Sequence, residues 1–242
     1  MCIRRPPCPP ADLGGWVWGW LARSRRPSRA VPSWALASAA LSPAVLTVAW
    51  LAADALQPAS YSPLRETISA LAGYGGNDRW IMTAGLFLVG GCHLAAAAGL
   101  NGLRLPARLL LVLAGLCSVG IATSPVTAGG PPSLHLAWTG VGGVTIAVWP
   151  AVAGWRAPPR PAFVSARGSV VATVVFVALL GWVVVETRGG VYLGLAERLA
   201  SSIPTCWPFV VAVALRRAAP RTPGADRADA GQPAPERVPG RL

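Results

Sequence analysis

Hydrophobic positions gather in six long runs separated by short polar loops. The runs cover residues 33–56, 80–100, 107–124, 134–155, 169–186 and 197–215. An α-helix rises about 1.5 Å per residue, so about 20 apolar residues cross the roughly 30 Å hydrocarbon core of a bilayer. Each run approaches or exceeds that length. The pattern predicts an all-α integral membrane bundle of six transmembrane helices.

The third and sixth runs are the least regular. Run 107–124 is short for a span. Run 197–215 contains Pro204 and Pro208, which lack a backbone donor and predict a kink. A five-helix protein would break the alternation of charge described next, so six spans are retained.

Positive charge alternates from loop to loop. Every basic residue is an arginine, and seventeen of the 21 lie in the two tails and in the second and fourth loops. The alternate loops carry only Arg65, Arg79, Arg188 and Arg198. Loops rich in positive charge stay on the cytoplasmic side of a membrane. We therefore expect a multi-pass protein of the cell membrane with both termini in the cytoplasm.

Tryptophans near the ends of the runs fit the same arrangement. Amphipathic rings favour the boundary between lipid and water. We expect Trp34, Trp80, Trp149 and Trp155 to lie at that boundary.

Composition excludes some classes of binding partner. A net charge of +12 favours nucleic-acid binding in a soluble domain. Here the arginines separate apolar spans, so we exclude nucleic acid and expect membrane lipids as partners. The five cysteines show no CxxC or Cys/His spacing, so the sequence predicts no metal, disulfide or cofactor. It identifies no protein partner.

The chain divides into three regions. Residues 1–31 form a basic tail containing proline and tryptophan, without the apolar core of a signal peptide. The first run is therefore expected to remain as an uncleaved span, opening a transmembrane domain over residues 32–217. Residues 218–242 are rich in Pro, Gly, Ala and charge, and we expect this tail to be disordered.

Polar residues concentrate at the predicted extracytoplasmic ends of the spans. The candidate ligand-binding residues are Asp54, Arg65, Glu66, Ser69, His135, Glu186, Glu197 and Arg198. On the sixth run, Arg198, Ser201, Ser202 and Thr205 recur at helical spacing and form one polar stripe. We expect Arg198 to point inward and pair with Glu186 or Asp54. Such a pair would either close this end of the bundle or belong to a ligand pocket.

The first extracytoplasmic loop contains a predicted short amphipathic helix over residues 62–71. Ser62 can cap it and Pro63 suits its first helical position. Leu64, Ile68 and Leu71 then share one apolar face. The helix would lie on the outer surface, either as a lid over the polar cluster or as a simple cover.

Two histidines are the remaining candidates for chemistry. His93 lies in the middle of the second run, where an ionisable residue is a functional hypothesis; a neutral ring bonded to a neighbouring group is the structural alternative. His135 could act as a base for Ser69 or Ser124, but no spacing requires such a nucleophile. The two histidines lie at different predicted depths, which disfavours a shared metal site.

Several motifs together resemble one family. They are Tyr61-Ser62-Pro63, the segment from Arg65 to Leu71, Asp78-Arg79-Trp80-Ile81-Met82, Ser124-Pro125, His135 and Gly194-Leu195-Ala196-Glu197-Arg198. This combination is similar to the bacterial and archaeal membrane proteins grouped as the domain of unknown function 998 family, over roughly residues 32–217. The resemblance implies a six-helix membrane protein and supplies no activity or catalytic residue.

Three functions therefore remain open. The protein could hold a lipid or small ligand in a polar pocket at the extracytoplasmic face, which the polar cluster favours. It could be a membrane-embedded enzyme acting on a lipid through His135, although no metal or nucleophile constellation is apparent. It could be a small transporter, although no inverted repeat or charged midplane path is evident.

Overall fold

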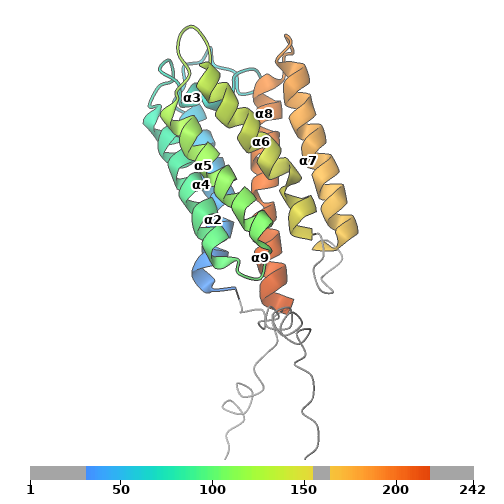
Figure 1. Ribbon diagram of the computed structural model, residues 1–242. Helices are drawn as coiled ribbons and strands as arrows, with labels where there is room; N and C mark the ends of the chain where they lie inside the picture. Colours follow the sequence, from blue (N-terminus) through green and yellow to red (C-terminus); the bar gives the residue numbers. More distant parts are fainter. Residues whose placement is uncertain (1–30, 155–163, 219–242) are drawn as a thin grey trace, which may run out of the picture.

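The computed structural model describes residues 31–154 and 164–218, and its elements in these ranges are helices (Figure 1). They are α2 Ser33–Asp54, α3 Ile68–Leu71, α4 Trp80–Gly99, α5 Leu105–Thr123, α6 Ser133–Gly154, α7 Ala166–Glu186, α8 Leu193–Thr205 and α9 Trp207–Ala218. The predicted tails fall almost wholly outside the described residues, as does Trp155.

Within residues 31–154 and 164–218, six helical segments are long and apolar enough to cross a membrane, which confirms the predicted all-α fold. Five are the single helices α2, α4, α5, α6 and α7, and the sixth combines α8 with α9 over Leu193–Ala218. Helix α7 begins three residues before the predicted run, because the Ser165 hydroxyl accepts a hydrogen bond from the Gly168 amide and caps it. The other boundaries differ from the prediction by similar amounts.

The predicted proline kink is present in the sixth span. The helix is interrupted at Cys206, between Pro204 and Pro208. Each proline removes one backbone donor from the helical ladder, so the continuous pattern fails between them. As a result, α8 and α9 are separate segments of one membrane crossing.

The helices pack as a ring in chain order. Each helix contacts the next: α2 with α4, α4 with α5, α5 with α6, α6 with α7, and α7 with α8. Contacts of α2 with α8 and α9 then close the ring. Glycines allow close approaches between helices: a Cβ on Gly90 would lie 2.8 Å from the Gly115 carbonyl oxygen, and one on Gly115 would lie 2.9 Å from that of Gly90. Small residues thus bring α4 and α5 together, as small residues do in membrane bundles.

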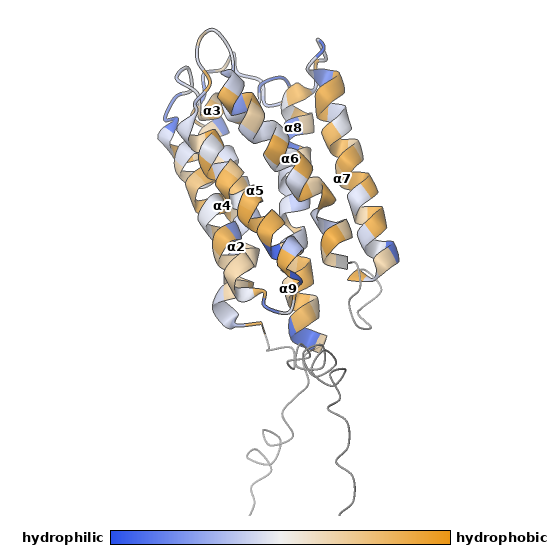
Figure 2. Ribbon diagram, viewed as in Figure 1, coloured by the Kyte–Doolittle hydropathy of each residue, from blue (hydrophilic) through white to orange (hydrophobic). Residues whose placement is uncertain are grey.

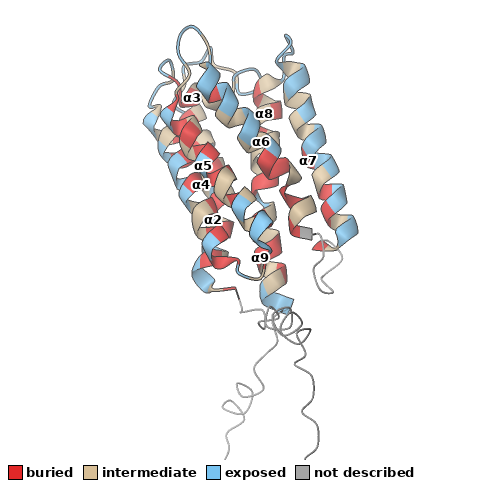
Figure 3. Cartoon of the chain, in the orientation of Figure 1, coloured by how far each residue is buried: buried red, intermediate tan, exposed pale blue. Residues whose placement is uncertain are grey.

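The outside of the ring is strongly apolar. Figure 2 shows hydrophobic residues along the outer faces of the helices, and Figure 3 shows that many of these positions are exposed. Exposed examples are Leu41, Val48, Leu116 and Val174. Helix α7 is the least covered of the spans. Apolar exposure on this scale is expected where lipid, rather than water, surrounds the protein.

The predicted loop helix begins later than expected. Its helical part is α3 alone, and the Thr67 side chain caps it by accepting from the Ala70 amide. Residues 63–65 form a turn instead. Ile68 and Leu71 are buried as predicted, whereas Leu64 is exposed. The proposed start at Ser62 is therefore wrong.

The placement expected for Trp149 is also wrong. Its side chain is fully buried, and its indole Nε1 donates to the Ala107 carbonyl oxygen at 2.7 Å. This hydrogen bond satisfies the indole N–H inside the bundle, so the ring can be buried away from the boundary between lipid and water. Trp34 and Trp80 are exposed, as an interfacial position requires.

Candidate functional site

Arg198 is a buried arginine that lies at the same end of the bundle as α3. Its side chain is 6% exposed, and its Nη2 lies 2.7 Å from Asp54 Oδ1. Asp54 is the last residue of α2, so the ion pair joins α2 to α8. Glu186, the other predicted partner, instead accepts hydrogen bonds from Trp182 Nε1 at 3.0 Å and the Tyr192 amide at 2.8 Å. The predicted pairing of Arg198 is thus confirmed for Asp54.

Tyr61 completes this ion pair. Its hydroxyl donates to Asp54 Oδ1 at 2.8 Å and accepts from Arg198 Nη2 at 2.7 Å. Burial, followed by the hydrogen bond to Asp54, raises the pKa of the Tyr61 phenol above its usual value. The phenol therefore stays neutral, and the charges of Arg198 and Asp54 balance. The guanidinium also lies 5.4 Å from the centre of the Trp50 ring, within the range of a cation–π contact.

The same guanidinium fastens the first loop to α8. Arg198 Nη1 donates to the carbonyl oxygens of Pro63 at 2.8 Å, Glu66 at 2.7 Å and Gly194 at 3.0 Å. The bonds to Pro63 and Glu66 anchor the turn before α3 to helix α8. Gly194 permits the approach, because a Cβ there would collide with these same two loop carbonyls.

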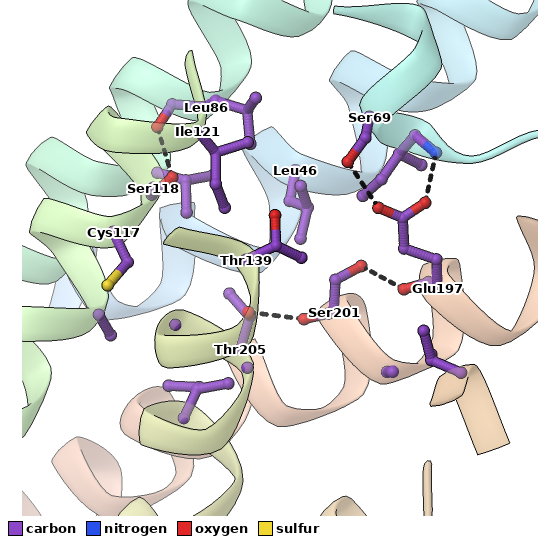
Figure 4. A pocket seen from close by; sticks show the side chains of 18 of the residues that line it. Leu46, Ser69, Leu86, Cys117, Ser118, Ile121, Thr139, Glu197, Ser201 and Thr205 are labelled. Atoms are coloured by element: carbon purple, nitrogen blue, oxygen red, sulfur yellow. Dashed lines mark hydrogen bonds between the residues drawn. The ribbon is translucent and has the colours of Figure 1, made fainter. Parts of the chain in front are cut away.

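Glu197 projects from α8 in a different direction from Arg198. Its Oε2 accepts from the Ile68 amide and its Oε1 from the Ser69 hydroxyl, each at 2.8 Å (Figure 4). Its carboxylate thus caps the first turn of α3. Adjacent residues on a helix are about 100° apart, which places Glu197 and Arg198 in different surroundings.

Glu197 lines a cavity of about 150 Å³ in the interior of the ring. All the spans contribute to its wall, with Leu46 from α2, Met82 from α4, Cys117 from α5, Thr139 from α6, Leu180 from α7 and Ser201 from α8. Most of the surface that lines the cavity is apolar. Figure 4 shows Thr139, Ser201 and Glu197 around the same space.

Some polar groups on the cavity wall are satisfied by backbone carbonyls, of a neighbouring helix or of their own. The Ser118 hydroxyl donates to the Leu86 carbonyl oxygen at 2.7 Å. Those of Ser201 and Thr205 donate one turn back along α8, to the carbonyl oxygens of Glu197 at 2.7 Å and Ser201 at 2.6 Å. These three hydroxyls have little need of a further partner.

Two other polar groups on the wall lack partners. Neither ring nitrogen of His93 makes a hydrogen bond of good geometry within the described residues, although the Val89 backbone one turn earlier interacts with the ring. The buried Thr139 hydroxyl has no partner there either. Buried polar side chains are hydrogen-bonded in the large majority of cases. His93 and Thr139 therefore leave hydrogen-bonding capacity directed at one cavity.

The structure does not bring His135 into this site. The ring is buried, and Nδ1 lies 2.7 Å from the Ser124 carbonyl oxygen. The hydroxyls suggested as nucleophiles are engaged elsewhere: Ser124 donates to the Gly120 carbonyl and Ser69 to Glu197. The contacts of His135 thus support a structural role that joins α5 to α6.

The remaining predicted residues lie at the edge of the site. The Arg65 side chain is exposed. The Glu66 carboxylate accepts from the Ser62 amide at 3.3 Å, so Glu66 reaches Arg198 only through its backbone carbonyl. Of the predicted set, the structure brings Asp54 to Arg198 and Ser69 to Glu197. In the described ranges, no group of three or more His, Cys, Asp or Glu residues could hold a metal ion.

Comparison with known proteins places the chain in one family. No curated protein and no solved structure matches it. One family model matches residues 40–214, which include four of the spans in full, most of the first and last spans, the Arg198 network and the cavity. The chain belongs to the family described as Protein of unknown function (DUF998).

Proposed function

We propose that this multi-pass membrane protein holds a small amphipathic ligand, or one end of a membrane lipid, in the cavity between its spans. The observation that carries the proposal is the pair of unpartnered polar groups, His93 and Thr139, on the wall of one mainly apolar cavity. Ligand sites combine apolar walls with a few placed polar groups.

The size of the cavity limits the ligand. A cavity of about 150 Å³ is comparable with cavities that hold a single aromatic ring. A whole phospholipid is much larger. The occupant is therefore a small molecule, or the end of a longer one whose remainder lies in the bilayer.

The structure favours binding over the alternatives considered from the sequence. A lipid enzyme based on His135 needs a nucleophile beside that ring, and the hydroxyls of Ser69 and Ser124 are bonded elsewhere. No observation among the described residues specifically favours transport, so we propose binding alone.

Filling the cavity tests this function. Ala200 lines the cavity, so Ala200→Phe should occupy it and reduce the retained ligand by about tenfold or more. Native mass spectrometry of protein extracted with its own lipids measures the retained mass. Ala137→Phe, the same change at an exposed position of α6, is the matched control and should retain the ligand. Equal retention by Ala200→Phe, or no bound molecule in the natural protein, would reject the function.

We further propose that the α3 end of the bundle faces away from the cytoplasm, in the cell membrane. The support is the arginine distribution, seventeen against four, which favours cytoplasmic termini. A reporter active only outside the cytoplasm should be silent when fused after Arg217. It should be active when inserted in the loop after Ala128. Activity after Arg217 would refute this orientation.

A further inference from the structure

The charge on the cavity wall is unbalanced. Among the residues that the structure describes, Glu197 is the only Asp, Glu, Lys or Arg side chain on the wall. The groups that donate to its carboxylate, the Ile68 amide and the hydroxyl and backbone of Ser69, are all neutral. A carboxylate has about four lone-pair sites, so acceptor capacity remains. The site therefore offers a ligand a carboxylate whose charge no neighbouring cation neutralises by contact.

Arg198 does not supply the missing positive charge. It is close enough to attract Glu197 electrostatically. Its terminal nitrogens, however, are bonded to Asp54, Tyr61 and three backbone carbonyls. Because Asp54 balances Arg198 and Tyr61 is neutral, an ionised Glu197 adds one negative charge that no side chain of this cluster balances. A buried charge is costly unless a counter-charge or a proton accompanies it.

We infer that the ligand is a protonated amine attached to a small apolar body, with its ammonium group on the Glu197 carboxylate. This inference rests on the proposed binding function and adds the chemical class of the ligand. An ammonium supplies both the counter-charge and N–H donors, which form strong charge-assisted hydrogen bonds with a carboxylate. The apolar body would lie against Leu46, Met82 and Leu180.

His93 and Thr139 give the same ligand a second point of recognition. Thr139 can donate or accept a hydrogen bond, and a neutral imidazole offers one donor and one acceptor. A hydroxyl or carbonyl on the body of the amine could satisfy either group. An amine can bind Glu197 without a hydrogen bond to His93 or Thr139. A probe that carries only an ammonium group and an apolar body therefore tests the charged contact by itself.

Benzylammonium and benzyl alcohol are suitable probes, because each carries one aromatic ring and they differ mainly in charge. Calorimetric titration of the protein in nanodiscs, with empty nanodiscs as the blank, measures both affinities at pH 7. We expect the natural protein to bind benzylammonium about tenfold more tightly or better. Glu197→Gln should bring the two affinities within about threefold of each other. Glu186→Gln removes a carboxylate outside the cavity and should leave the preference unchanged.

The outcomes separate this inference from the function on which it rests. If the natural protein binds benzyl alcohol as tightly as benzylammonium, the amine inference is overturned while a ligand cavity stands. If neither probe binds, both are overturned. Persistence of the preference in a folded Glu197→Gln protein would also overturn the role of Glu197. The natural protein alone decides the first two outcomes, so they do not depend on the variant folding.

Discussion

Replacing Arg198 by methionine is expected to destabilise the folded protein by about 3–5 kcal/mol, because it leaves the Asp54 carboxylate buried without its cation. The same change removes the donor that holds the carbonyl oxygens of Pro63 and Glu66. Unfolding of the purified protein in detergent, followed by the loss of buried tryptophan signal, measures the change in free energy.

The double variant Arg198→Met with Asp54→Asn separates charge from packing. Removing both charges should recover part of the lost stability, whereas the loop carbonyls remain without their donor. Arg65→Met is the matched control, since Arg65 is an exposed arginine of the same loop. Its effect should stay within about 0.5 kcal/mol. Equal effects of Arg198→Met and Arg65→Met would contradict the assignment of a buried ion pair.

Replacing Gly194 by alanine is expected to destabilise the protein by about 1–3 kcal/mol, because the added methyl group must displace the Pro63 and Glu66 carbonyls. Displacement of this segment should also weaken the bond from the Ile68 amide to Glu197. Hydrogen exchange at Ile68 should therefore become faster. Thermal unfolding together with exchange at this amide tests both consequences.

Gly181→Ala provides the control for that substitution. Gly181 lies in α7 with no atom within 4 Å of an added Cβ, so alanine should be neutral there or should slightly stabilise the helix. If Gly194→Ala behaves like Gly181→Ala, the loop does not depend on close approach to α8, and the description of the Arg198 network is wrong.

The features predictable from the sequence were those set by local pattern. Length and hydropathy located the spans because a bilayer needs about 20 apolar residues per crossing. Pro204 and Pro208 predicted the interruption of the sixth span because each lacks a backbone donor. Arg198 was expected to pair with Glu186 or Asp54 because a buried arginine needs an acid at the same depth, and only the structure distinguishes the two.

The errors arose from contacts between distant segments. Ser62 and Pro63 predicted a helix start from their own side chains. In the structure, however, the Pro63 carbonyl oxygen accepts a hydrogen bond from Arg198, 135 residues later in the chain. Trp149 lies near the end of its run, yet a bond to Ala107 on another helix keeps it inside. Neither partner can be identified from the sequence around these residues.

The cavity itself was also beyond the sequence. His93 was a functional hypothesis because it lies within an apolar run, but its neighbours could not be named. The cavity beside His93 depends on how the six spans pack, and residues from all six spans form the wall of the cavity. Tyr61 was quoted only as part of a family motif, because its bonds to Asp54 and Arg198 depend on the path of the loop.

The most direct measurement is a density map of the protein, extracted in nanodiscs with its native lipids, at a resolution that shows side chains. We predict non-protein density in the cavity that contacts the Glu197 carboxylate and extends toward His93 and Thr139. A cavity closed by rearranged side chains, with His93 and Thr139 bonded to protein groups and no added density, would contradict the proposed binding function.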